Sequence, residues 1–174
     1  MSASIEIRPG TPEDIEAVLL LERSVSEAPH WSRFEYESIF QPNEGQGGIQ
    51  RRLWIAETRV PHSWSLRRLS PRMSGIGFAV AKVIPSAELA ELESIVVSPA
   101  MRRQGVGTRL CQASIEWCRA RGAVSVELEV RSSSHAAIRL YWSLGFFTQG
   151  VRRAYYRDPE EDAALMRLNV KQRN

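Results

Sequence analysis

A basic, glycine-containing stretch between an apolar run and a helical pattern is the segment best suited to bind a ligand. The β-branched run at 95–97 breaks at Ser98-Pro99, as expected at the end of a strand, because proline has no backbone donor. After the stretch 102–107, apolar residues recur at 106, 110, 113 and 117. That spacing is typical of one helix face, and the helix is expected to stop at Gly122.

The chemistry of this stretch favours an anionic ligand. A helix N-terminus presents unpaired backbone N–H groups and the positive end of the helix dipole. Arg102 and Arg103 add positive charge, and the glycines let a polyanion approach the backbone closely. The stretch is not a P-loop, because no Gly-Lys-Ser/Thr follows, and Leu110 stands where a dinucleotide fingerprint would need its third glycine. We therefore expect a phosphate or pyrophosphate site here.

The order of these parts resembles the GNAT N-acetyltransferases, in which an Arg/Gln-x-x-Gly-x-Gly/Ala loop after such a strand holds the pyrophosphate of acetyl-CoA. Further motifs occur in the order and spacing of the ribosomal-protein-alanine N-acetyltransferase branch: Leu-Glu-Val-Arg at 128–131, Ala-Ala-Ile-Arg-Leu-Tyr at 136–141, Ser-Leu-Gly-Phe at 143–146 and Arg-Arg-Ala-Tyr-Tyr at 152–156. The resemblance covers roughly residues 88–170.

This resemblance implies a cofactor site along the central strand and the basic loop. Acetyl-CoA would be the co-substrate, with no metal. Its pantetheine would meet the backbone of Ile95, Val96 and Val97 like an added strand. Its pyrophosphate would meet Arg102, Arg103, Gln104, Gly105, Val106, Gly107 and Thr108. Ser134 stands where the family usually has asparagine, and its shorter side chain reaches less far.

Acetyl transfer to an amine needs a proton acceptor for the amine and a proton donor for the departing thiolate. Glu129 lies on the polar face of its expected strand and matches the glutamate given the base role in the resembling branch; the structural alternative is a salt-bridged surface carboxylate. Glu91 and Glu93, on one face of the preceding strand, could serve instead. Tyr141 matches the tyrosine that points at the CoA sulfur, although it also continues an apolar helical stripe typical of a core residue.

Three aromatic residues are candidates for the acceptor site by the same resemblance. Trp31 lies in a Pro-Trp-Ser-like junction with His30 inserted, and a hydrophobic staple onto the following helix explains it equally well. Tyr155 and Tyr156 match residues that flank the peptide groove, while aromatic packing at a turn is the structural alternative.

The elements predict a mixed α/β sheet, mostly antiparallel, with helices on both faces, in the order β-α-α-β-β-β-α-β-α-β-β. Thr11-Pro12 and Ser32 begin the first two helices. Alternation over 123–131 places Val124, Val126, Leu128 and Val130 on one face. The last two strands are expected at 146–151 and 163–170, with 155–159 between them.

Composition bounds the class of protein. The 174 residues fit one domain over 1–174, with 43% hydrophobic and 25% charged residues and a net charge of +3. The segment 58–74 holds four arginines and no acid. A solvated insertion is favoured over a basic flap for RNA or another anionic partner, and direct nucleic-acid binding is not expected. No apolar run suits a membrane span or signal peptide, and Cys111 and Cys118 read as packed thiols of a cytoplasmic protein. The sequence carries no signal of oligomeric state.

The functional hypothesis is therefore acetyl transfer to a protein N-terminal α-amine, with the N-terminal alanine of a small-subunit ribosomal protein as the leading acceptor, by direct attack in a ternary complex. An α-amine has a pKa near 8 and a lysine amine one near 10.4, so the terminal amine is the easier nucleophile. Two rivals remain: acetylation of a lysine or small-molecule amine, and a non-catalytic acyl-CoA-binding module.

Overall fold

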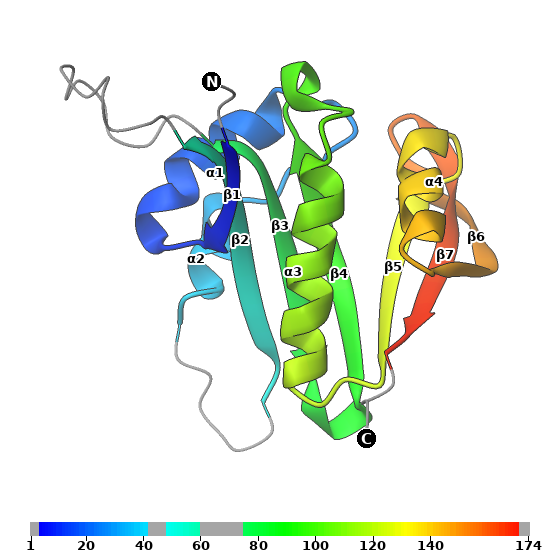
Figure 1. The fold of residues 1–174 in the computed structure, drawn as a ribbon. Coiled ribbons are helices and arrows are strands. Elements are labelled where there is room, and N and C mark those ends of the chain that lie inside the picture. The colour runs from blue at the N-terminus through cyan, green and yellow to red at the C-terminus, as the bar shows by residue number, and fades with distance from the viewer. Residues whose placement is uncertain (1–3, 42–47, 60–74, 171–174) are drawn as a thin grey trace, which may run out of the picture.

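The computed structural model describes residues 4–41, 48–59 and 75–170 (Figure 1). Most of the basic segment 58–74 lies outside the described residues. The strands are β1 (Ser4–Pro9), β2 (Gln50–Arg59), β3 (Gly75–Ile84), β4 (Leu89–Val97), β5 (Ser125–Arg131), β6 (Phe147–Arg157) and β7 (Glu160–Asn169). The α-helices are α1 (Ile15–Arg23), α2 (Arg33–Ser38), α3 (Val106–Ala120) and α4 (His135–Ser143).

One seven-stranded sheet holds all the described strands, in the order β1-β2-β3-β4-β5-β7-β6. Neighbouring strands are antiparallel except for β4 and β5, which are parallel and are connected through α3. The expected order of elements and the mixed, mostly antiparallel sheet are confirmed.

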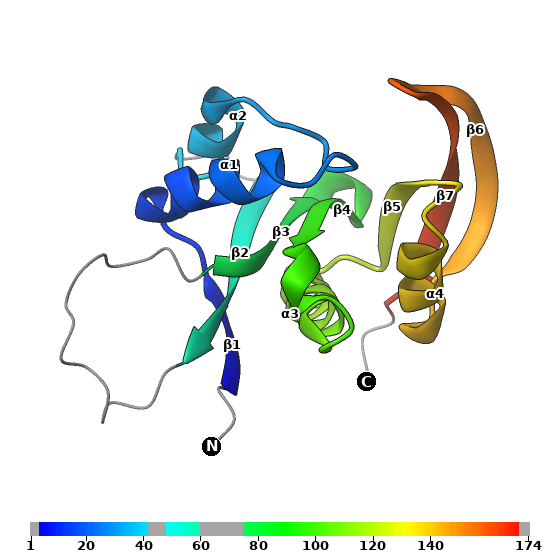
Figure 2. The ribbon, with the colours of Figure 1, turned by 90° about the horizontal axis from the view of Figure 1, so that it is seen from above.

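Helices cover both faces of the sheet, but unevenly (Figure 2). On one face, here called the α3 face, α3 and α4 bury a cluster that includes Leu110, Trp117 and Met166. On the opposite α1 face, α1 and α2 bury a second cluster that includes Tyr36 and Phe78. In the described part of the chain, no helix covers the α1 face of β5, β7 and β6. Polar side chains of these strands on that face can therefore meet a ligand.

A β-bulge in β4 exchanges the two faces of that strand. Val80 pairs with Ser94 but Ala81 pairs with Leu92, so Glu93 is an extra residue on β4. Because side chains alternate with period two, one extra residue turns the following side chains to the other face. Leu92 accordingly belongs to the core of the α3 face, whereas Val96, four residues later, belongs to the core of the α1 face.

The parallel pair β4–β5 is short. Its register joins Leu89–Glu91 to Ser125–Glu127 and goes no further, and the two strands then diverge toward their C-terminal ends (Figure 1). From Leu92 to Val97 the edge of β4 that faces β5 therefore has no ladder of hydrogen bonds with that strand. These unpaired ends of β4 and β5, here called the open end of the pair, lie at the same end of the molecule as the beginnings of α3 and α4.

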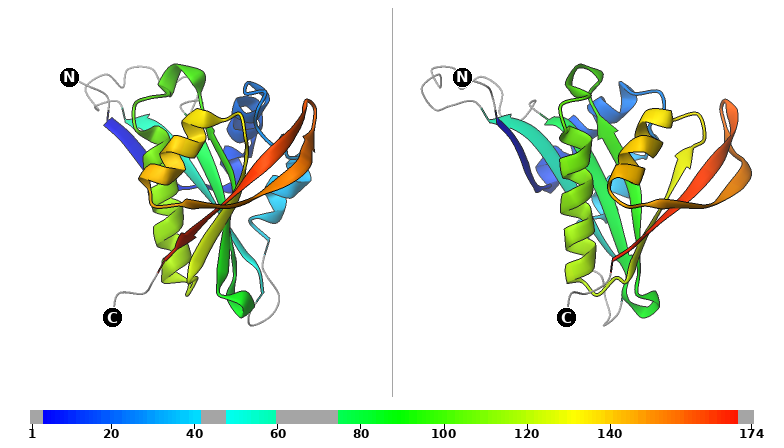
Figure 3. Two further views of the ribbon diagram at one scale, coloured as in Figure 1. Left: turned by 90° about the vertical axis from the view of Figure 1, so that its right-hand side faces the viewer. Right: turned by 45° about the vertical axis from the view of Figure 1, so that its right-hand side comes forward.

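The C-terminal hairpin differs from the sequence prediction. The expected boundary at 155–159 was wrong, because β6 runs to Arg157 and β7 begins at Glu160, so both Tyr155 and Tyr156 lie within a strand. Nearly every residue of β6 is exposed, and its register shifts twice, so no apolar alternation marks the strand. The end of this long hairpin curves toward the side of α1 and α2 (Figure 3).

The start of β5 also needs a correction. Val124 was expected to share the buried face of Val126, but it precedes the strand and is 43% exposed. Its backbone connects neighbouring segments instead, donating to the carbonyl of Glu88 and accepting from the N–H of Val170. Ser125, which the alternation over 123–131 places on the face opposite to Val126, is buried as well.

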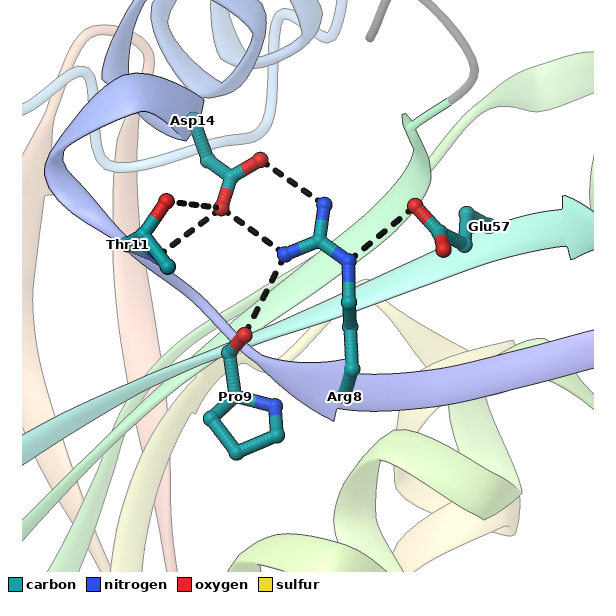
Figure 4. Close-up of polar contacts among 5 residues, drawn as sticks. All are labelled: Arg8, Pro9, Thr11, Asp14 and Glu57. Atoms are coloured by element: carbon teal, nitrogen blue, oxygen red, sulfur yellow. Dashed lines mark hydrogen bonds and ion pairs between the residues drawn. The ribbon is translucent and has the colours of Figure 1, made fainter.

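An ion-pair network joins the first strand to the first helix (Figure 4). Arg8 of β1 donates two hydrogen bonds of 2.8 Å to the carboxylate of Asp14, and its Nε lies 3.1 Å from Glu57 of β2. The carboxylate of Asp14 also accepts from the backbone N–H of Thr11 at 2.8 Å. The hydrogen bonds from Arg8 are the main reason that the pKa of buried Asp14 lies below its ordinary value of 3.8.

We expect Arg8→Met to lower the free energy of unfolding by about 2 kcal/mol at neutral pH, because Asp14 loses a charged hydrogen-bond partner. A depressed folded-state pKa contributes stability above the unfolded pKa, and this is lost as pH falls through the folded value. Urea unfolding should show a difference between the two proteins that narrows below pH 3.8. The control Arg33→Met removes an exposed ion pair with Glu16 and should change little. A difference that widened on acidification would contradict this account.

A buried hydrogen bond joins α1 to α2. The hydroxyl of Tyr36 donates to the carboxyl of Glu22 at 2.8 Å, and the two residues are 0% and 1% exposed. Trp31, just before the Ser32 cap, packs on Tyr36 with ring centroids 5.4 Å apart. The staple expected from the sequence is thus confirmed, and it fixes the connection between the two helices.

Tyr36→Phe should destabilise the protein by about 1–3 kcal/mol, because it leaves a buried carboxyl without its donor. The double variant Tyr36→Phe/Glu22→Leu removes both polar groups and should recover part of that loss. Thermal unfolding of the three proteins measures both effects. A double variant less stable than the single one would refute the explanation.

Candidate active site

The residues predicted to hold a cofactor meet at the open end of the β4–β5 pair. β4 ends at Val97, a turn follows at Pro99–Met101, and α3 begins at Val106. Arg102, Arg103 and Gln104 are exposed between them, and Nε of Arg102 lies 3.4 Å from the carbonyl oxygen of Val97. The end of the strand, the basic loop and the first turn of the helix therefore form one surface.

Two glycines shape the start of α3. Gly105 caps the helix with a φ of +78°, and no side chain at this position accepts from the first turn. A Cβ there would meet nothing within 4 Å. At Gly107 a Cβ would lie 3.1 Å from Cδ2 of Leu140, so this glycine lets α4 approach α3. The helix N-terminus is thus uncapped on one side and packed against α4 on the other, which suits a phosphate group.

The remaining predicted cofactor residues differ in what they can offer. The side chain of Val106 is 1% exposed and belongs to the core, so only its backbone is available. Thr108 is half-buried in the first turn of α3. Ser134 caps α4, but its hydroxyl makes no hydrogen bond to that helix, which leaves the hydroxyl available for a ligand.

Glu129 lies on the uncovered part of the α1 face. Its carboxylate is 29% exposed and lies 2.8 Å from Nη1 of Arg152 on β6. The guanidinium of Arg152 also stacks over the ring of Tyr155, 4.9 Å from its centroid. The pKa of Tyr155 is raised, chiefly by its hydrogen bond with Glu129. One carboxylate thus engages both a cation and a phenol.

The second register shift of β6 gives the two tyrosines their positions. Arg152 pairs with Ala163 and Tyr156 with Glu161, so β6 carries two extra residues. Asp162 holds this bulge, accepting from the N–H of Ala154 at 2.9 Å and pairing with Arg153 at 2.7 Å. The Ala154 N–H is the main cause of the lowered pKa of Asp162.

Tyr156 lies between several charged groups at the edge of this region. Its ring packs edge-on against that of Tyr155, with centroids 5.1 Å apart, and the guanidinium of Arg131 lies 4.2 Å from its centroid. Burial, followed by the proximity of Tyr155, raises the pKa of Tyr156 to about 12. The sequence-predicted acceptor tyrosines therefore lie next to the sequence-predicted base.

Tyr141 lies on the other side of the sheet. It belongs to the core of the α3 face, is 4% exposed and packs against Phe146 with ring centroids 5.7 Å apart. Burial, with smaller effects from Cys111 and Tyr156, raises the pKa of Tyr141 well above 10. Its phenol is therefore protonated at neutral pH, the state that a proton donor needs.

The two predicted catalytic side chains thus approach β5 from opposite faces. Glu129 projects on the α1 face and Tyr141 comes from α4 on the α3 face. A continuous sheet would separate them, but β4 and β5 are paired only as far as Glu91 and Glu127. Glu129 lies two residues beyond Glu127, in the part of β5 that has no ladder with β4.

The alternative carboxylates are engaged elsewhere. Nζ of Lys82 lies 2.6 Å from Glu91 and 3.4 Å from Glu93, which confirms that both lie on one face. Glu93 also receives a bidentate interaction from Arg51 at 2.8 and 3.1 Å. Glu91 lies in the paired segment of β4, away from the open end of the pair.

Trp31 lies in the connection between α1 and α2 and is half-buried through its packing on Tyr36. This connection passes beside the divergent ends of β4 and β5 (Figure 2).

The two thiols are free and buried, and burial raises the pKa of Cys111 and of Cys118 to about 12.

Within the described residues, His, Cys, Asp and Glu form no group of three that could hold a metal ion. No helix in the same residues has the length and apolar character needed to cross a membrane.

Two residues of this region were missed from the sequence. Arg152 stands in the Arg-Arg-Ala-Tyr-Tyr motif, but its ion pair depends on the register of β6 across β7. Asp162 gives no sequence signal, because the bulge that it holds is visible only in the folded hairpin.

Comparison with known proteins identifies relatives for this arrangement. The acetyltransferase (GNAT) family model matches residues 31–146. The chain is 42% identical over 95 residues to the [ribosomal protein bS18]-alanine N-acetyltransferase of Escherichia coli strain K12, covering 53% of this chain and 63% of that relative. It is 46% identical over 77 residues to the N-alpha-acetyltransferase RimI of Mycobacterium tuberculosis, covering 44% of this chain and 47% of that protein.

Solved structures extend the likeness over almost the whole chain. The crystal structure of the ribosomal-protein-S18-alanine N-acetyltransferase from Escherichia coli matches with a TM-score of 0.71 and 28% identity, over 98% of this chain and 97% of that one. Arabidopsis thaliana NAA60, crystallised with acetyl-CoA, shares the fold with a TM-score of 0.76 at 19% identity, over 96% and 99% of the two chains. The family match, the mixed sheet and the loop-to-helix arrangement agree, and this chain belongs to the acetyltransferase (GNAT) family.

Proposed function

We propose that this protein transfers an acetyl group from acetyl-CoA to the N-terminal α-amine of a protein, with the N-terminal alanine of a small-subunit ribosomal protein as the acceptor. The observation that carries the proposal is the early end of the β4–β5 ladder, with Glu129 in the unpaired part of β5 and Tyr141 in the core of the opposite face. The names of the relatives from Escherichia coli support the choice of acceptor.

The residues at the open end fit the co-substrate. The uncapped first turn of α3, beside Arg102 and Arg103, suits its pyrophosphate, and the unpaired edge of β4 at Ile95–Val97 offers backbone groups to its pantetheine. Ser134 offers a free hydroxyl. Acetyl-CoA, when bound, supplies the acetyl group as a thioester.

The protein's own groups then handle two protons. An α-ammonium has a pKa near 8, so at neutral pH it must give up a proton before it can attack, and Glu129 receives that proton. As the new N–C bond forms and the C–S bond breaks, Tyr141 donates its phenolic proton to the thiolate. The second proton that the acylated nitrogen loses then restores the phenol through solvent. Tyr155, Tyr156 and Trp31 line the path of the acceptor peptide on the α1 face.

The first measurement is release of the CoA thiol with three acceptors: a peptide beginning with alanine, the same peptide acetylated at its N-terminus, and a peptide whose only amine is a lysine. We expect turnover with the free N-terminus alone. Turnover only on the lysine peptide would replace the α-amine assignment. Binding of acetyl-CoA without turnover on any amine would show a non-catalytic module.

Glu129→Gln and Tyr141→Phe should each lower kcat by about a hundredfold or more, the usual contribution of a positioned acid or base. Glu127→Gln is the matched control, because Glu127 lies two residues earlier on the same face and pairs with Arg167 at 2.9 Å. Its kcat should stay close to wild type. Turnover unchanged in both Glu129→Gln and Tyr141→Phe, with thermal unfolding also unchanged, would remove both residues from the mechanism.

A further inference from the structure

The ion pair of Glu129 differs from those of its neighbours on the α1 face. Glu91 and Glu93 are held by Lys82, whose side chain is only 15% exposed, and Glu127 by Arg167, at 32%. Arg152, the partner of Glu129, is 52% exposed and projects from β6, at the edge of the sheet. Exposed ion pairs are weak, because water solvates both partners well when they separate. The cation on Glu129 is therefore the one most readily displaced among these pairs.

Arg152 occupies the same carboxylate that an acceptor amine needs. Its Nη1 lies 2.8 Å from Oε1 of Glu129, which is an ion pair at contact distance. An ammonium group that contacted the same oxygen would meet the guanidinium at short distance, and the two positive charges would repel each other. Close contact of the acceptor with this oxygen of Glu129 thus requires that Arg152 move away.

The acceptor itself carries the charge needed for this exchange. At neutral pH an α-amine is mostly an ammonium ion, so it arrives as a cation with hydrogen-bond donors. It can replace Arg152 on Glu129 without leaving the carboxylate unpaired. The ring of Tyr155, already stacked under Arg152 and hydrogen-bonded to Glu129, remains in place to contact the new cation.

We propose that Arg152 is a positioning residue that holds Glu129 in the free protein and is exchanged for the ammonium group of the acceptor. This inference rests on the proposed function. A residue that only stabilised the hairpin would have a different effect: its removal would loosen the site and weaken acceptor binding. The exchange predicts that removal of Arg152 strengthens acceptor binding, because the acceptor no longer competes with the guanidinium for Glu129.

The test compares Arg152→Gln with Arg153→Gln. The two variants change the net charge equally at adjacent positions, but Arg153 pairs with Asp162 and not with Glu129. Binding of the alanine-initiated peptide is measured calorimetrically with CoA present, so that no transfer occurs. The N-terminally acetylated peptide serves as a ligand without an ammonium group, and thermal unfolding checks that both variants are folded.

Arg152→Gln should lower the Kd of the free peptide by about two- to fivefold, the range set by the strength of a partly exposed ion pair. It should leave the Kd of the acetylated peptide unchanged, and Arg153→Gln should change neither. In turnover, the acceptor KM should fall in Arg152→Gln while the KM for acetyl-CoA stays constant.

The inference would be overturned if Arg152→Gln bound the free peptide no more tightly than the wild type does. It would also be overturned if Arg153→Gln bound that peptide equally more tightly, or if the wild type did not bind it. Thiol release by the wild type tests the proposed function separately. Tighter binding in Arg152→Gln without any turnover would refute the acetyl transfer but support the cation exchange. Turnover with no tightening would refute only the exchange.

Discussion

The early end of the β4–β5 pairing is the constraint on which the rest of the site depends. Parallel strands normally continue their ladder, and unpaired backbone groups inside a protein are costly unless another partner satisfies them. Here the ladder stops after Glu91, and β4 continues to Val97 with one edge free of β5. We propose this edge as the surface that binds the co-substrate, and the start of α3 follows the end of the strand. The parallel connection through α3 brings these parts together.

Charge on the α1 face is arranged in rows across the strands. Arg51, Lys82, Glu91, Glu127 and Arg167 occupy successive register positions from β2 to β7. Lys82 and Glu91, and likewise Glu127 and Arg167, bring opposite charges together on neighbouring strands and stabilise the sheet. Glu129 lies one step further toward the open end, and its partner comes from a strand that is not its neighbour. Ion pairs within the row from Arg51 to Arg167 thus stabilise the sheet, whereas the ion pair of Glu129 with Arg152 is the one that we propose the acceptor displaces.

The sequence predicted the parts whose signals are local. Helical spacing and the Gly-containing loop located α3, and the Ser32 cap with Trp31 located the staple on α2. The two bulges could not be found in this way. Around Glu93 buried and more exposed residues continue to alternate, although the extra residue exchanges the two faces of β4. The bulge of β6 depends on Asp162, which lies on the neighbouring strand β7. Arg152 escaped notice for the same reason, because its role depends on a register that only the folded hairpin sets.

β6 also has a consequence for the solution behaviour of the protein. It is an eleven-residue strand at the edge of the sheet, with Phe147, Val151 and Tyr155 exposed. Such an edge is a template for pairing with strands of other molecules, and natural proteins blunt it with charges and bulges. Its two register shifts break the straight row of donors and acceptors, and three arginines add like charges that repel a second copy. The irregularity that aims the tyrosines therefore also guards this edge against aggregation.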